Sequence, residues 1–230
     1  MSTRSTSGCW RLWGCELKVD RFAYLFKQYL PFLFPLVEYS ARGVTRVRFG
    51  RAIASAQNEG SLEGKLGERT AVIRPLGVDD AEKLHDFLDA LPAAYFEFFR
   101  PHGFGRKQIR TVLASRAFAN YAIFSGDEMI AYALLKLAPT GTAYIGLLVA
   151  PGQAGLGLGK FIVHYLYWQA SLAGLRTRST ISKHNPASMR CHEAVSDFRV
   201  VAELPNNYVM IEYPVKEVEA PSLGSEQVNE

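Results

Sequence analysis

Three features that would each mark a class of protein are scarce in this sequence. The three cysteines, Cys9, Cys15 and Cys191, have no metal-ligand spacing, and any disulfide pairing would leave one thiol over. Such sparse use of cysteine is typical of a reducing compartment, so we expect a cytoplasmic protein that holds no metal. The net charge is only +4, and no basic stripe occurs beyond the N-terminal third, which argues against nucleic acid as a partner.

The sequence also lacks a run that would form a membrane-spanning helix. Its most apolar stretch, residues 22–39, is rich in aromatic side chains and leucine, but Lys27, Pro31, Pro35 and Glu38 interrupt it. A spanning helix needs ~20 apolar residues with few charges, and two prolines in its middle would disrupt it. No small-residue cleavage site follows the stretch, so it does not resemble a signal peptide either.

Two interpretations of this N-terminal segment stay open. In the first, residues 20–40 form a helical extension that packs on the domain or on a partner chain, as in a homodimer. In the second, residues 20–51 make a peripheral membrane contact. This second interpretation rests on the four arginines between positions 42 and 51, which follow the aromatic stretch and would attract an anionic surface.

The composition divides the rest of the chain. Residues 52–68 are small, polar and contain glycine, which predicts a linker. With the segment before it, this linker makes an N-terminal extension over residues 1–68. A folded domain then covers residues 69–215. The acidic stretch 216–230 is typical of a flexible, solvated tail.

The hydrophobic pattern of the domain predicts both strands and helices. Apolar runs bounded by turn residues indicate strands, and apolar residues spaced by three and four indicate helices. The predicted order is β-α-α-β-β-β-α-β-α-β-β, with strands at 70–76, 121–124, 129–137, 143–149, 177–182, 198–204 and 208–213, and helices from about Asp79, Tyr95, Phe161 and Pro186. The continuously apolar strand 143–149 is expected at the centre of the sheet. This order indicates an α/β fold with a mixed sheet.

A glycine-rich loop follows the strand 143–149. Gly155, Gly157 and Gly159 alternate where the next helix begins, although glycine lowers helix propensity. The pattern is useful where bare backbone must approach a ligand, and the amides of a helix N-terminus attract phosphate. No acidic residue ends the next strand, as a dinucleotide site would need, and the lysine of the loop precedes phenylalanine, unlike a Walker loop. A flexible turn without a ligand is the alternative.

The stretch 146–160 resembles motif A of the GNAT acetyltransferase superfamily, which joins a strand and a proline to an arginine or glutamine and then to spaced glycines. The resemblance extends over residues 70–213 in the order of elements and leaves the first third of the chain outside. It implies a GNAT-type fold, an α/β fold with a mixed, mainly antiparallel central sheet flanked by helices. The N-terminal helical segment is extra to that fold. It also implies transfer of an acetyl group from acetyl-CoA to an amine.

The resemblance assigns most cofactor contacts to this strand and loop. In the family, the splayed strand pairs with the pantetheine arm, which implies this role for Leu147, Leu148 and Val149. Backbone amides of the loop bind the pyrophosphate, which implies roles for Gln153, Ala154, Gly155, Gly157, Gly159 and Lys160. Ala154 stands where the family has arginine or glutamine, so Gln153 is expected to substitute through a shift of one residue.

A second motif of the same family matches residues 184–193. Asn185 corresponds to an asparagine on the pantetheine or adenine side of the cofactor, although an N-cap is an equally good role. His192 stands seven positions later, where many relatives have a tyrosine that protonates the departing thiolate. Histidine can donate a proton when charged, or hydrogen-bond the sulfur, so the resemblance implies that His192 is the general acid. Simple packing beside the cofactor is the alternative.

The acceptor amine must be neutral to attack a thioester, so a base is needed. His102 lies in the loop between the first two helices of the domain, where acceptor sites of the family are usually lined, and His184 and Tyr208 are further candidates. The aromatic run 95–99 and the residues after it are similar to acceptor loops of GNAT enzymes acting on small molecules, including amino sugars. We therefore expect a small-molecule amine as acceptor. A protein or peptide amine, and a CoA-binding module without catalysis, are the alternatives.

Overall fold

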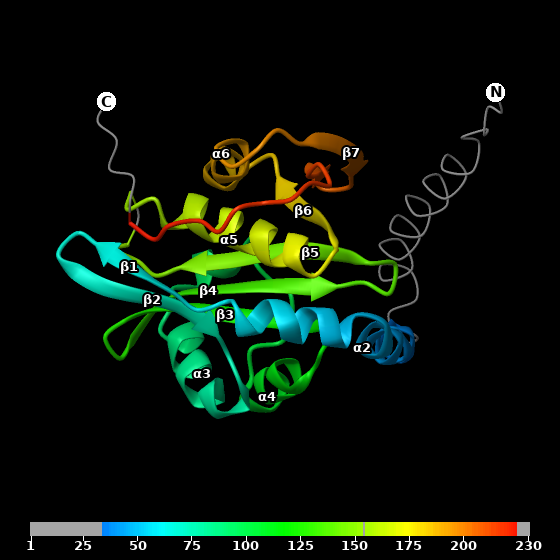
Figure 1. The fold of residues 1–230 in the computed structure, drawn as a ribbon, viewed down its shortest axis with the longest axis horizontal. Helices are drawn as coiled ribbons and strands as arrows, with labels where there is room; N and C mark the ends of the chain where they lie inside the picture. Colours follow the sequence, from blue (N-terminus) through cyan, green and yellow to red (C-terminus); the bar gives the residue numbers. More distant parts are fainter. Residues whose placement is uncertain (1–33, 154, 225–230) are drawn as a thin grey trace, which may run out of the picture.

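The computed structural model describes residues 34–153 and 155–224, which form an eight-stranded sheet with helices on both faces (Figure 1). The strands are β1 (Leu62–Leu66), β2 (Arg69–Pro75), β3 (Phe118–Ser125), β4 (Glu128–Leu137), β5 (Thr142–Val149), β6 (Arg176–Ser182), β7 (Arg199–Leu204) and β8 (Tyr208–Glu212). The helices are α2 (Phe34–Asn58), α3 (Ala81–Asp89), α4 (Arg106–Ala114), α5 (Leu158–Leu172) and α6 (Pro186–Glu193), with short 3₁₀ helices η1 (Val78–Asp80) and η2 (Ala93–Phe96). The predicted fold class is confirmed.

The strands lie in the order β1-β2-β3-β4-β5-β6-β8-β7, and each neighbouring pair is antiparallel except β5 and β6. Tight turns produce the antiparallel hairpins, as in the β7–β8 turn, where Asn206 and Asn207 both have a φ of 59°. β5 and β6 run parallel because α5 crosses over the sheet between them. The sheet is therefore mixed and mainly antiparallel.

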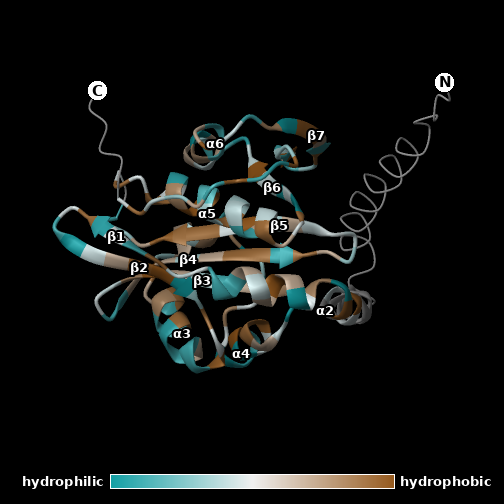
Figure 2. Ribbon diagram, in the orientation of Figure 1, coloured by the Kyte–Doolittle hydropathy of each residue, from teal (hydrophilic) through white to brown (hydrophobic). Residues whose placement is uncertain are grey.

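Two core clusters lie on opposite faces of the sheet. Tyr132 and Leu134 belong to the cluster under α3 and α4, whereas Ala131 and Ala133 belong to the cluster under α5 and the end of α2. Ile130 breaks this alternation, because a β-bulge opposite β3 makes it an extra residue and turns it to the α5 side. Figure 2 shows the apolar residues concentrated in the inner strands, between the two helical layers.

Residues 52–68 are not a linker, contrary to the prediction. Their first part completes α2 and their second part forms β1, which pairs with β2 along its whole length. Ile53 and Ala56 are buried in the cluster under α5, and the hydroxyl of Tyr165 donates a hydrogen bond to the carbonyl oxygen of Gly60. The polar composition belongs to the exposed side of a helix and of an edge strand.

The predictions for the two ends of the chain have different outcomes. Residues 20–33 of the predicted helical segment 20–40 lie outside the described residues, while residues 34–40 are helical as expected and belong to α2, which continues to Asn58. Within the described part, no helix is long and apolar enough to cross a membrane. The prediction of a solvated tail from residue 216 is wrong for Val218 and Leu223, which pack against the core.

Candidate functional site

The parallel strands β5 and β6 diverge partway along their length. Their register covers three residue pairs, from Thr142 with Arg176 to Tyr144 with Arg178. Beyond that point β5 pairs with β4 and β6 with β8, and no further pair joins β5 to β6 in the described chain. We call the gap between residues 145–149 and residues 179–182 the β5–β6 wedge. It leaves one backbone edge of each strand unpaired.

The wedge determines how far the central strand is buried. The continuously apolar sequence predicted that residues 143–149 lie at the centre of the sheet, and β5 does lie inside it. Ile145, Gly146 and Leu147 are only half-buried, however, because β6 no longer covers their edge. The apolar side chains serve the two core clusters, while the backbone edge stays accessible.

The glycine loop lies at the open end of the wedge, because it follows the C-terminal end of β5. Gly152, Gly155 and Gly157 have φ values of 82°, 82° and 71°, a left-handed conformation that other residues rarely adopt. Around each of them, no described atom beyond the chain neighbours lies within 4 Å of the position a Cβ would take. Gly157 is the N-cap of α5, and it supplies no side-chain cap. Open amides at a helix N-terminus form a site for phosphate.

Gly159 is required for a different reason. A Cβ atom at this position would lie 2.6 Å from the Sγ atom of Cys191 on α6. The first turn of α5 therefore approaches α6 too closely to carry a side chain there. Burial raises the pKa of the Cys191 thiol, which stays protonated in this contact. Packing explains this glycine, whereas Gly155 and Gly157 border open space.

The side chains predicted beside the pantetheine arm point to different faces. Leu147 and Val149 pack on the α5 side, and Leu148 is buried in the cluster under α3 and α4. Only their backbone is shared with the wedge. Phe99 covers β5 from the α3 side, since a Cβ at Gly146 would lie 3.2 Å from its ring. Phe99 belongs to the aromatic run 95–99, which was predicted as part of the acceptor loop.

The other predicted cofactor residues are spread along the mouth of the wedge. The backbone nitrogen of Gln153 donates to the carbonyl oxygen of Ala150 at 3.2 Å, and Gln153 also lines a cavity beside the loop. Ala154 lies outside the described residues, and Lys160 is exposed on the first turn of α5. Asn185 is the N-cap of α6, because its Oδ1 atom accepts from the backbone nitrogen of Ser188 at 3.0 Å. Its contact with a cofactor stays a prediction.

His192 is enclosed between α6 and β8. His192 is 1% exposed, and its Nδ1 atom lies 2.8 Å from the hydroxyl oxygen of Tyr213. Burial lowers the pKa of His192 to about 4, so the ring is neutral near pH 7. Donation from a charged ring is therefore not available to it, and the general-acid role stays a prediction that this position does not favour.

His102 lies over β3 and β4, with both ring nitrogens engaged. Its Nδ1 atom is 2.8 Å from the carbonyl oxygen of Gly103, and its Nε2 atom is 3.0 Å from the hydroxyl oxygen of Tyr132. Tyr132 is in turn 2.7 Å from the Oδ1 atom of Asn120. Burial is the main reason that the pKa of His102 is lowered, and the charge of nearby Lys136 adds to this. The contacts hold His102 one strand away from the wedge.

His184 and Tyr208 lie at the β6 side of the wedge. His184 is exposed just after the end of β6, and its Nε2 atom is 3.0 Å from the Nδ2 atom of Asn207 in the β7–β8 turn. Tyr208 is half-buried and pairs with Ser182, the last residue of β6. The structure therefore brings these two candidates together at the end of the diverging strand.

Family comparison agrees with this geometry. Residues 84–198, half of the chain, match the family model described as the Acetyltransferase (GNAT) family. No curated protein matches the sequence. The matched range contains the glycine loop and the residues of the wedge, and it leaves out α2, β1 and β2.

Several solved structures share the fold. The chain is similar to the GNAT domain of S. lividans PAT, with a TM-score of 0.59 and 18% identity, over 67% of this chain and 97% of that one. It is also similar to the ribosomal-protein-S5-alanine acetyltransferase from Vibrio fischeri (TM-score 0.56, 11% identity, 69% and 98% covered). A third is a GNAT-family acetyltransferase from Streptococcus pneumoniae (TM-score 0.51, 14% identity, 62% and 98% covered). At these low identities, the structural similarity shows a common fold.

Proposed function

Because the chain belongs to the GNAT acetyltransferase family, we propose that it transfers the acetyl group of acetyl-CoA to a primary amine of a small molecule. The observation that carries this proposal is the β5–β6 wedge with the glycine loop at its open end. An amino sugar is one acceptor of this class. The remaining question is what each part of the wedge contributes.

The residues present fit the cofactor. The unpaired edge of residues 145–149 offers amide and carbonyl groups to an arm that itself contains amides, in the manner of an added strand. Gly155 and Gly157 leave their surroundings open, and the N-terminus of the 15-residue helix α5 favours negative charge. When bound, acetyl-CoA supplies a thioester whose carbonyl carbon an amine can attack.

The protein's own contribution is orientation and charge stabilisation. Pairing with β4 holds β5 in place, so the amides on its unpaired edge need no reorganisation to donate to a developing oxyanion. A neutral amine is required, and His184 and Tyr208, at the end of β6, are better placed than His102 to accept its proton, directly or through water.

An aromatic loop supports a small acceptor. Phe96, Phe99 and Phe104 form a cluster between η2 and α4, with ring centroids 4.8 Å apart for Phe96 and Phe104. Tyr95 and Phe98 are each 37% exposed beside it. Such a surface suits a compact molecule with apolar faces. The name of the Vibrio fischeri protein gives a ribosomal protein as its acceptor, so protein amines are the alternative.

A thiol-release assay tests the proposal. The full chain is mixed with acetyl-CoA and with a panel of amines, including amino sugars, other small amines and short peptides. We expect release of free CoA that depends on a small amine and exceeds the release with any peptide. Release with peptides alone would favour the alternative acceptor. CoA binding without release for any amine would make the chain a binding module, and a lack of CoA binding would contradict the proposal.

A further inference from the structure

A cavity of about 390 Å³ lies beside the glycine loop, and the proposed reaction leaves it unused. Seven residues line it: Leu66, Glu68 and Arg69 from the β1–β2 hairpin, Ser125 and Ile130 from β3 and β4, and Gln153 and Leu156 from the loop. None of the lining residues comes from β6, β8 or α6. The cavity therefore lies on the hairpin side of the loop.

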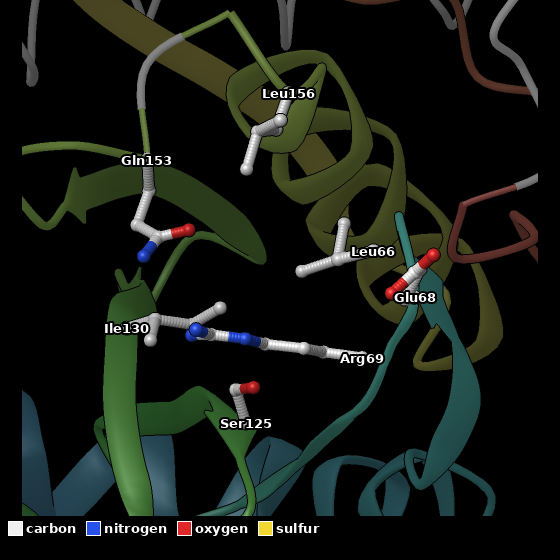
Figure 3. A pocket seen from close by; sticks show the side chains of 7 residues that line it. All are labelled: Leu66, Glu68, Arg69, Ser125, Ile130, Gln153 and Leu156. Atoms are coloured by element: carbon white, nitrogen blue, oxygen red, sulfur yellow. The ribbon is translucent and has the colours of Figure 1, made fainter.

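The cavity carries an unmatched positive charge. Figure 3 shows the side chain of Arg69 extended across the cavity, between Gln153 and Ser125. Among the described residues, no carboxylate forms an ion pair with its guanidinium; Glu68, which also lines the cavity, points away from the guanidinium end (Figure 3). A guanidinium, an amide and a hydroxyl that converge in this way match the oxygens of a phosphate group.

The cavity also has an apolar lining. Leu66, Ile130 and Leu156 contribute aliphatic side chains, and Ile130 lies beside the guanidinium end of Arg69 (Figure 3) because the β-bulge turns it to this face. Such a lining suits a flat ring system. The cavity as a whole thus matches a molecule with one apolar ring and one phosphate.

The position next to the glycine loop indicates which molecule this is. A pyrophosphate on the amides of Gly155 and Gly157 would carry a further group on its outer side. On the α6 side, Gly159 packs against Cys191, since a Cβ atom at Gly159 would lie 2.6 Å from the Sγ atom. Toward the hairpin, Gln153 and Leu156 open directly into the cavity. The acetyl end of the cofactor would lie along β5, in the other direction.

We propose that this cavity binds the adenosine end of CoA, and that Arg69 binds its 3′-phosphate. The inference rests on the proposed function and adds to it a contact made by the β1–β2 hairpin. The hairpin lies outside residues 84–198, which match the family model.

Calorimetric titrations test this assignment. CoA, 3′-dephospho-CoA and 4′-phosphopantetheine are each titrated into wild type, Arg69→Ala and Lys65→Ala. Lys65 is a matched control, since it is an exposed cation on the same hairpin and does not line the cavity. We expect Arg69→Ala to weaken CoA about 10- to 100-fold, the effect of losing a charged hydrogen bond. Dephospho-CoA and 4′-phosphopantetheine should bind both proteins alike, and Lys65→Ala should match wild type.

Each outcome separates this inference from the proposed function. If wild type binds CoA and Arg69→Ala binds it equally well, the cavity does not hold the 3′-phosphate and the proposed function stands. Equal weakening of CoA and dephospho-CoA would also overturn the assignment of Arg69. If inorganic phosphate competes with CoA as well as adenosine 3′,5′-bisphosphate does, the site is a general anion site and the inference fails. A wild type that binds no CoA refutes the proposed function itself.

Discussion

The imidazole of His192 and the hydroxyl of Tyr213 form a buried hydrogen bond, with 2.8 Å between Nδ1 and the oxygen. Each residue is 1% exposed. This hydrogen bond needs only one proton between the two groups, so a neutral imidazole can form it. Burial keeps the ring neutral by lowering the pKa of His192 to about 4. The pair joins α6 to the residue that follows β8.

The free energy of unfolding should fall as the pH is lowered from about 6.5 to 4. The pKa of His192 is about 4 when folded, below its ordinary value of 6.5, so the unfolded chain binds a proton that the folded chain excludes. The contribution is complete above pH 6.5 and is lost toward pH 4, on the order of 3 kcal/mol. Urea unfolding across this range compares wild type with His192→Phe, which should show the smaller slope. Equal slopes would assign the acid sensitivity to other groups.

Gly159→Ala should destabilise the protein by about 1–3 kcal/mol, because the new Cβ atom would lie 2.6 Å from the Sγ atom of Cys191. In a Cys191→Ala background the same change should be neutral or stabilising, since alanine favours a helix over glycine by about 1 kcal/mol. Thermal unfolding of the wild type, the two single variants and the double variant measures the coupling. If the stability changes of the two single variants add up to that of the double variant, the contact with Cys191 does not cause the loss of stability in Gly159→Ala.

Gly157→Val should abolish CoA binding, because a side chain would enter the open space at the N-terminus of α5. Gly174→Val is the matched control, since Gly157 and Gly174 have φ values of 71° and 65° and neither has a neighbouring atom within 4 Å of a Cβ in the described chain. Both variants should lose about 1–2 kcal/mol of stability through the left-handed backbone. Titration with CoA should detect a loss only for Gly157→Val. Binding by this variant with normal affinity would contradict the role of the loop.

Glu212→Gln should be far more costly than the same change at Glu203. Glu212 is 3% exposed and contacts Arg178 and Arg199 at 2.6 Å each. Although burial alone would raise the pKa of Glu212, the hydrogen bonds from Arg199 and Arg178 leave it lowered. Loss of this charge removes a carboxylate from buried Arg178, at about 3–5 kcal/mol. Glu203 pairs with Lys183 at the surface, so Glu203→Gln should cost under ~1 kcal/mol in urea unfolding. Equal costs would contradict the buried ion pair.

Local patterns in the sequence were sufficient for the glycine loop and for the order of elements from β2 to β8. Spaced glycines directly before an apolar helical pattern lie within one short stretch of sequence, so the loop could be predicted from that stretch alone. The β1–β2 hairpin also left a signal, the alternation of Leu62 and Leu66 before Gly67, but its polar composition favoured a linker. Arg69, the first residue of the predicted domain, was missed because the cavity that it lines is built from segments that are distant in the sequence.

Other features depend on contacts between distant segments. The half-burial of β5 comes from the divergence of β6, and the burial of His192 comes from Tyr213, 21 residues later. Gly159 could be recognised as a glycine of the loop, but only the position of Cys191 shows that it is a packing residue. No local pattern contains these relations.

The divergence of β5 from β6 divides the sheet into five strands on one side and three on the other. Three β5–β6 residue pairs and the connecting helix α5 link these two parts of the sheet. Acetyl-CoA whose arm pairs with the free edges of both β5 and β6 would add a further link between them for as long as it is bound. Hydrogen exchange should therefore slow in β5 and β6 together when CoA is added, and the release of CoA after each reaction would return the sheet to its looser state. The domain would tighten and relax once in every turnover.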